Sequence, residues 1–136
     1  MPVSKKEELC AYHEAGHAVL AVILGMPVES VSMKDRVTKY KVEGKIRDSI
    51  LVSLAGAFAA QHIDKMGLTA ADDLYKAKRL LIEGENIESF EREAKRLVKK
   101  HKKIIHAVAL ELLSKNCLTG EEVKRIVDIH FLPQQT

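Results

Sequence analysis

A chain of 136 residues is long enough to bury its own hydrophobic core, and we expect residues 1–136 to form a single domain. Hydrophobic residues make up 46% of the chain and charged residues 30%, which excludes an intrinsically disordered chain. The net charge of +3 is too small to indicate nucleic acid binding by itself, and the scarcity of aromatic residues, glycine and proline favours helices over a β-sandwich.

Targeting signals are not evident in the sequence. The first residues, MPVSKKEEL, lack the apolar core of a signal peptide, and no apolar run reaches the roughly 20 residues that a membrane helix needs. Cys10 and Cys117 lie far apart and form no CxxC motif. We therefore expect a reduced, cytoplasmic protein without a membrane segment.

The first predicted helix begins at a capping box, Ser4-Lys5-Lys6-Glu7. Apolar residues then recur at helical spacing as far as Ile23, and Gly25 ends the helix. Loose alternation over residues 28–33 and 37–43 predicts two short strands that are joined by a polar turn.

Two further helices are predicted in the middle of the chain. Asp48 or Ser49 is placed to cap a helix whose apolar residues run through 50–63. Thr69 is placed to cap the next helix, which we expect to continue to Gly84.

The last third of the sequence predicts a long amphipathic helix from Ile87 that ends at Asn116. Another capping box, Thr119-Gly120-Glu121-Glu122, precedes a short final helix that reaches about Ile129. The predicted fold class is mainly α (α+β), with a small β-hairpin after the first helix.

The first helix carries the motif His13-Glu14-Ala15-Gly16-His17, which is an HExxH sequence. Residues four apart lie on one helix face, so the two imidazoles can reach the same metal ion. Zinc suits imidazole nitrogens, and Glu14 is placed to take a proton from a zinc-bound water. The motif therefore predicts a hydrolytic zinc site.

A catalytic zinc ion ordinarily has a third protein ligand. From the residues alone, His62, Asp64, Asp72 and Asp73 are all candidates. Acidic residues near a helix N-terminus also complement the helix dipole without any metal, so the choice between Asp72 and Asp73 stays open at this point.

Several segments together resemble the protease domain of the FtsH family of ATP-dependent zinc metalloproteases. Residues 11–18, AYHEAGHA, look like the active-site helix of that family, and residues 26–33 resemble the strand that follows it. Leu54-Ala55-Gly56-Ala57, residues 69–74 (TAADDL) and residues 112–127 are similar to later family segments in the same order.

The resemblance implies zinc as the cofactor, with His13, His17 and Asp73 as its ligands and Glu14 as the general base. The implied function is a zinc metallopeptidase that cleaves peptides or unfolded polypeptides. Family members form hexameric rings, so the resemblance also implies a homo-oligomer. They carry an AAA ATPase module and a membrane anchor. We expect a stand-alone protease domain, and the resemblance implies a separate ATPase as a candidate partner.

Two other functions fit parts of the sequence. One is a zinc-binding pseudo-protease that acts as an interaction or assembly protein, although such a protein would not need Glu14. The other is nucleic acid binding by a basic run in the long predicted helix, which consists of Lys95, Arg96, Lys99, Lys100, Lys102 and Lys103. No aromatic residue interleaves that run, so we interpret it as a solvated helix face and expect no nucleic acid partner.

Overall fold

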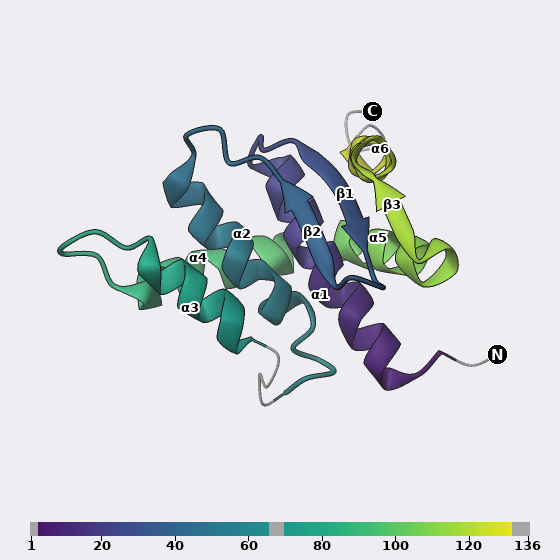
Figure 1. The fold of residues 1–136 in the computed structure, drawn as a ribbon, viewed down its shortest axis with the longest axis horizontal. Helices are drawn as coiled ribbons and strands as arrows, with labels where there is room; N and C mark the ends of the chain where they lie inside the picture. The colour runs from purple at the N-terminus through teal and green to yellow at the C-terminus, as the bar shows by residue number, and fades with distance from the viewer. Residues whose placement is uncertain (1–2, 66–69, 132–136) are drawn as a thin grey trace.

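The computed structural model describes residues 3–65 and 70–131. In this part of the chain it is mainly helical with a small antiparallel sheet, as the sequence predicts (Figure 1). The elements, in chain order, are α1 (Lys5–Ile23), β1 (Val28–Ser32), β2 (Val37–Tyr40), α2 (Ile46–Ala59), α3 (Ala71–Arg79), α4 (Ile87–Lys100), α5 (Lys102–Lys115), β3 (Cys117–Thr119) and α6 (Gly120–Phe131). None of the described helices is long and apolar enough to cross a membrane.

Helix α1 is the central element of the fold. The predicted capping box is confirmed, because the backbone N–H of Glu7 donates to the Ser4 hydroxyl while the Glu7 carboxylate accepts from the Ser4 backbone. The second half of α1 is buried between α2, α5 and the sheet (Figure 1). Small side chains such as Ala15 and Ala18, both fully buried, allow these neighbours to approach closely.

The sheet has the strand order β2-β1-β3, with both pairings antiparallel. The predicted β1–β2 hairpin is confirmed, and Val31 in β1 lies opposite Thr38 in β2 and Leu118 in β3. The third strand is a difference from the prediction. It has only three residues, so its alternation was too short to detect, and its last residue doubles as the cap of α6.

Helix α2 begins earlier than predicted. Lys45 occupies its N-cap without a side-chain hydrogen bond, so the predicted caps at Asp48 and Ser49 are wrong. The Ser49 hydroxyl instead donates to the backbone oxygen of Ile46 at 2.6 Å. The helix ends at Ala59, and residues 60–63 form a turn. The prediction had continued the helix to residue 63.

Helix α3 is shorter than predicted. It has Ala70 at its N-cap and ends at Arg79, five residues before the predicted stop at Gly84 (84 − 79). The predicted cap, Thr69, lies outside the described residues. Ala77 is fully buried and anchors α3 to the core, mainly against α2.

The long predicted helix is two helices, α4 and α5, which meet at His101. The apolar periodicity continues across this break because both helices bury a face in the same core. However, α4 packs mainly on α2 whereas α5 packs mainly on α1, which one straight helix does not achieve. The predicted end at Asn116 is confirmed by its left-handed φ of 68°.

The predicted capping box before α6 is also confirmed. The backbone N–H of Glu122 donates to the Thr119 hydroxyl at 3.1 Å, and the Thr119 N–H donates to the Glu122 carboxylate at 3.0 Å. This reciprocal pair fixes the point at which β3 passes into α6.

Candidate metal centre

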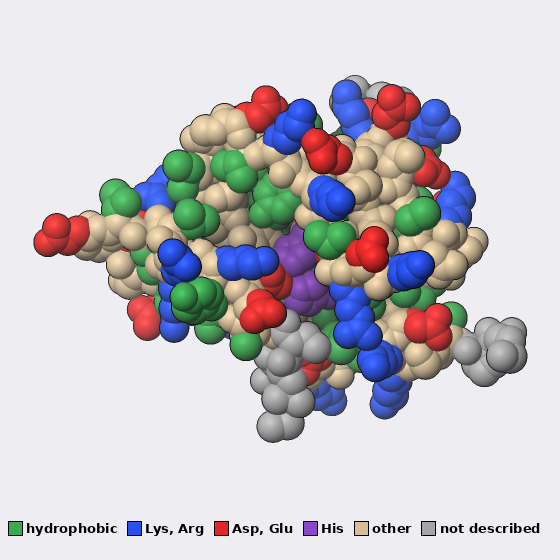
Figure 2. Space-filling view, in the orientation of Figure 1, with side chains coloured by type: hydrophobic (Ala, Val, Ile, Leu, Met, Phe, Trp, Pro, Cys, Tyr) green, Lys and Arg blue, Asp and Glu red, His purple; other side chains and the backbone are tan. Residues whose placement is uncertain are grey.

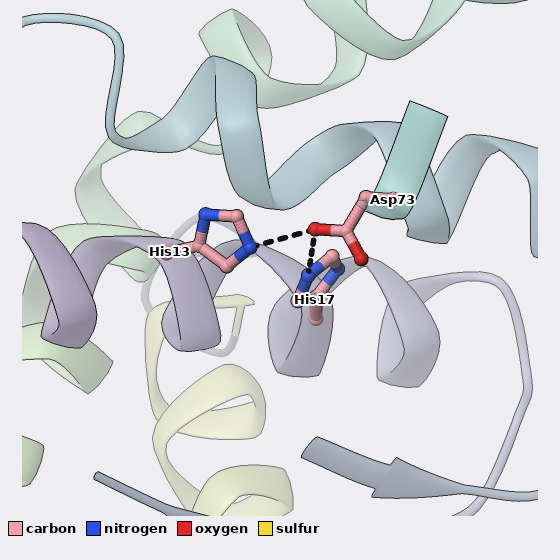
Figure 3. Close-up of side chains that lie close together, drawn as sticks. All are labelled: His13, His17 and Asp73. Atoms are coloured by element: carbon pink, nitrogen blue, oxygen red, sulfur yellow. Dashed lines mark hydrogen bonds and ion pairs between the residues drawn. The ribbon is translucent and has the colours of Figure 1, made fainter. Parts of the chain in front are cut away.

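The structure brings His13, His17 and Asp73 together, as Figure 3 shows. Oxygen Oδ2 of Asp73 lies 2.7 Å from Nε2 of His13 and 3.1 Å from Nε2 of His17. The possible ligand atoms of the three residues all lie within 4.8 Å of one another. Two histidines one turn apart on α1 and a carboxylate from α3 thus form a group that could hold a metal ion.

Asp73 reaches this group from the first turn of α3. The N-cap is Ala70 instead of the predicted Thr69, so the predicted start of this helix was wrong by one residue. Asp73 therefore occupies the third helical position. Asp72 is exposed at the cavity rim, outside the three-residue group. Among the described residues, the group does not include His62 or Asp64. The His62 ring instead packs edge-on against the Tyr12 ring.

His17 has an oxygen acceptor facing each ring nitrogen. Its Nδ1 lies 2.7 Å from the backbone oxygen of Val52, and its Nε2 faces the Asp73 carboxylate. A neutral imidazole has one N–H, so it satisfies only one of these acceptors. When Nδ1–H donates to Val52, the contact between Nε2 and Asp73 requires either a second proton or a cation.

The pKa shifts of His17 and Asp73 are consistent with that requirement. Burial lowers the pKa of His17, but its hydrogen bond to Asp73 and the negative charges of Asp73 and Glu14 outweigh burial, and the net shift is upward. Burial raises the pKa of Asp73, yet its hydrogen bonds with His13 and His17 hold that pKa well below the usual range. These two shifts favour a positive charge between Nε2 of His17 and the Asp73 carboxylate.

The donor set is compatible with a transition metal ion. Two imidazole nitrogens and one carboxylate oxygen are a common catalytic set, and the hydrogen bond to Val52 fixes the tautomer of His17 that leaves Nε2 free to coordinate. The buried Nδ1 of His13 has no hydrogen-bond partner among the described residues. A neutral tautomer of His13 with its proton on Nδ1 also leaves Nε2 available.

Glu14 lies on the same cavity wall as His13, His17 and Asp73 and is buried, with 5% of its surface exposed. Its Oε1 accepts a hydrogen bond of 2.8 Å from the Thr38 hydroxyl on β2. Sequence reasoning did not identify Thr38, because a threonine in a short strand carries no distinctive signal. The hydrogen bond holds one carboxylate oxygen of Glu14 in place.

Gly56 in α2 makes room for the two imidazoles. A Cβ atom at this position would lie 2.5 Å from Nε2 of His17 and 3.0 Å from Cδ2 of His13. Any larger residue would therefore collide with the rings. Sequence reasoning noted Leu54-Ala55-Gly56-Ala57 as a family-like segment but did not assign Gly56 this role.

These side chains line a cavity of about 500 Å³. His13, Glu14, His17 and Asp73 form part of its wall, and Thr38 and Tyr40 of the edge strand β2 form another part. The wall also includes three cationic side chains from separate parts of the chain, namely Lys6, Arg36 and Lys76. In Figure 2 the histidine surface is visible in a hollow near the centre of this face, with acidic and basic side chains around it.

Comparisons with known proteins do not assign this site. No protein-family model matches the chain, and no curated protein matches it. The interpretation of the centre therefore depends on its own geometry and on the motif.

Proposed function

We propose that the protein is a zinc metallopeptidase. The observation that carries the proposal is the convergence of His13, His17 and Asp73 beside the buried carboxylate of Glu14, on the wall of one cavity. Other hydrolytic metal sites use the same combination of two imidazoles, one carboxylate ligand and a neighbouring carboxylate base.

In this proposal His13, His17 and Asp73 hold the zinc ion. Bound zinc lowers the pKa of a water molecule to about 7 and polarises the substrate carbonyl. The histidine rings need little reorganisation to bind, because Val52 and Gly56 already restrict their positions.

Glu14 acts as the general base. It takes a proton from the attacking water and returns it to the amine nitrogen as the peptide bond breaks. The Thr38 hydroxyl holds Oε1, so the other oxygen, Oε2, is the one we assign to proton transfer. A neutral amide at position 14 would keep the shape of the side chain but would not accept the proton.

The substrate that we propose is an unfolded or short polypeptide. The cavity lies along β2, an edge strand whose residues Val37, Thr38 and Tyr40 line it. An extended peptide can pair with such an edge, whereas a folded chain cannot present its backbone in this way. The resemblance of the motif to the FtsH family supports the same substrate class, and by that resemblance we propose a hexamer served by a separate ATPase.

The test combines metal analysis with a peptidase assay. We expect about one zinc ion per chain, which His17→Ala removes and the matched variant His62→Ala retains. We expect the zinc-loaded protein to cleave unfolded casein, and Glu14→Gln to bind zinc without cleaving. Equal zinc in both histidine variants would refute the metal site. Zinc binding without any Glu14-dependent cleavage would refute the peptidase and favour the interaction or assembly role.

A further inference from the structure

A second cavity, of about 570 Å³, lies where α1 and the end of α2 meet α4 and α5. It shares no described wall residue with the cavity at the metal-binding group. Helices α4 and α5 lie behind α1 and α2 in Figure 1. Cavities of this size commonly hold small organic molecules. The proposed peptidase chemistry makes no use of it.

Part of the basic run found in the sequence lines this second cavity. Lys95 and Lys99 come from α4 and Lys102 comes from the start of α5, and we refer to these three residues as the cationic rim. Arg96, Lys100 and Lys103 alternate with them in the sequence and are absent from the described wall. The packing of α4 and α5 therefore divides the run into a cavity-lining half and an outward half.

In the part of the chain that the structure describes, the cationic rim has no carboxylate partner. Within the described residues, no Asp or Glu oxygen lies within 4.0 Å of an ammonium nitrogen of the rim, and no acidic side chain lines the cavity. The neighbouring Arg96, by contrast, pairs with Glu93. Three cations beside one cavity, without a compensating carboxylate there, create a positive potential that attracts an anion.

Apolar and aromatic groups form much of the rest of the wall. Lys95 Nζ lies 5.1 Å from the centroid of the Phe58 ring, and Val98 and Ile105 contribute aliphatic surface. The Tyr12 ring packs edge-on against His62 at 4.7 Å between centroids, and the Tyr12 hydroxyl hydrogen-bonds with Nδ1 of His106. These contacts hold polar ring groups at the wall beside an apolar surface.

We propose that this cavity binds a small organic anion, in which a ring-sized apolar body carries a phosphate or carboxylate group. The apolar body packs against Phe58, Val98 and Ile105, and the anionic group lies at the cationic rim. Binding needs both parts, because the exposed lysines alone hold an anion weakly while the apolar wall alone does not select for charge.

The test uses 1-naphthyl phosphate as the probe, titrated into the whole chain and followed by calorimetry and by NMR. We expect saturable binding with shifts at Tyr12, His62 and His106, and binding at least about tenfold weaker for inorganic phosphate and for neutral 1-naphthol. Shifts centred on His13 and His17, or no saturable binding below about 1 mM, would overturn the proposal.

A pair of charge-matched variants isolates the cationic rim. Lys99→Gln/Lys102→Gln should weaken probe binding about tenfold or more, whereas Lys100→Gln/Lys103→Gln, which removes the same charge from the outward half, should change it less than about threefold. All four lysines are exposed, so both variants should keep the helical circular dichroism of the parent. Equal weakening in the two variants would show attraction by overall charge and would overturn the site.

Discussion

Replacing Gly56 by Ala is the sharpest test of how the metal centre is built. The added Cβ would lie 2.5 Å from Nε2 and 2.6 Å from Cε1 of His17, about 1 Å inside a normal van der Waals separation of about 3.5 Å. The His17 ring has little freedom to move away, because it is buried and its Nδ1 is hydrogen-bonded to Val52.

Two opposing effects set the magnitude. In a helix interior, Gly→Ala ordinarily stabilises by about 1 kcal/mol, whereas overpacking a filled site costs about 1–3 kcal/mol. The difference between these effects predicts that Gly56→Ala lowers the free energy of unfolding of the zinc-free protein by up to about 2 kcal/mol. We expect its zinc affinity to fall about tenfold or more, because the ring that carries Nε2 is displaced.

A double-mutant cycle attributes the cost to the ring. In a His17→Ala background the main collision is absent, so Gly56→Ala should stabilise by up to about 1 kcal/mol. The coupling energy should then equal the overpacking cost, about 1–3 kcal/mol. Urea unfolding followed by far-ultraviolet circular dichroism measures the stabilities, and competition with a chromophoric chelator measures zinc affinity. The reasoning is refuted if Gly56→Ala has the same effect on stability in both backgrounds.

Three further outcomes are expected. Asp73→Asn should reduce zinc affinity at least about 100-fold in the chelator assay, while the zinc affinity of Asp72→Asn should stay within about twofold of the parent. A larger loss of zinc affinity in Asp72→Asn than in Asp73→Asn would mean that the ligand was misassigned. Thr38→Val should leave zinc content unchanged and slow casein cleavage about tenfold, because Glu14 loses the hydrogen bond that orients it. An unchanged cleavage rate would show that Thr38 has no part in the proposed mechanism. Gly120→Ala should lower the free energy of unfolding in urea by at least about 3 kcal/mol, because the added Cβ would lie 1.7 Å from a backbone oxygen in β1. A near-neutral result would contradict that packing.

Local hydrogen bonding explains which parts of the fold were predictable. The capping boxes at Ser4 and Thr119 involve residues three apart, so their donors and acceptors can be read directly from the sequence. The left-handed end of α5 at Asn116 is local in the same way. These features were predicted correctly because no distant contact decides them.

Tertiary packing decided the features that were missed. The break at His101 depends on α4 and α5 packing against different helices, which an uninterrupted apolar periodicity does not reveal. Strand β3 depends on pairing with β1, more than 80 residues away (117 − 32 = 85). The start of α2 at Ile46 has no side-chain cap to indicate it.

The same distinction between local pattern and tertiary packing applies to His13, His17 and Asp73. The spacing of His13 and His17 predicts that they share a helix face, and this needs no knowledge of the fold. Asp73 was singled out only by the family resemblance, and its arrival at the histidines depends on how α3 packs against α2. The role of Thr38 depends on β2 lying beside α1, which no local pattern encodes.

Helix α2 contributes to the centre almost entirely through its backbone. Val52 and Gly56 are four residues apart and therefore lie on one face of the helix, where the carbonyl oxygen of Val52 accepts from His17 and the missing side chain of Gly56 leaves space for the ring. A side-chain substitution at Val52 leaves its carbonyl oxygen in place, so position 56 is the point at which a single substitution disturbs this support. This arrangement explains why two histidines one turn apart are a weak signal in a sequence. The two imidazoles are held in a common orientation because a second helix supplies an acceptor for one nitrogen and room for both rings.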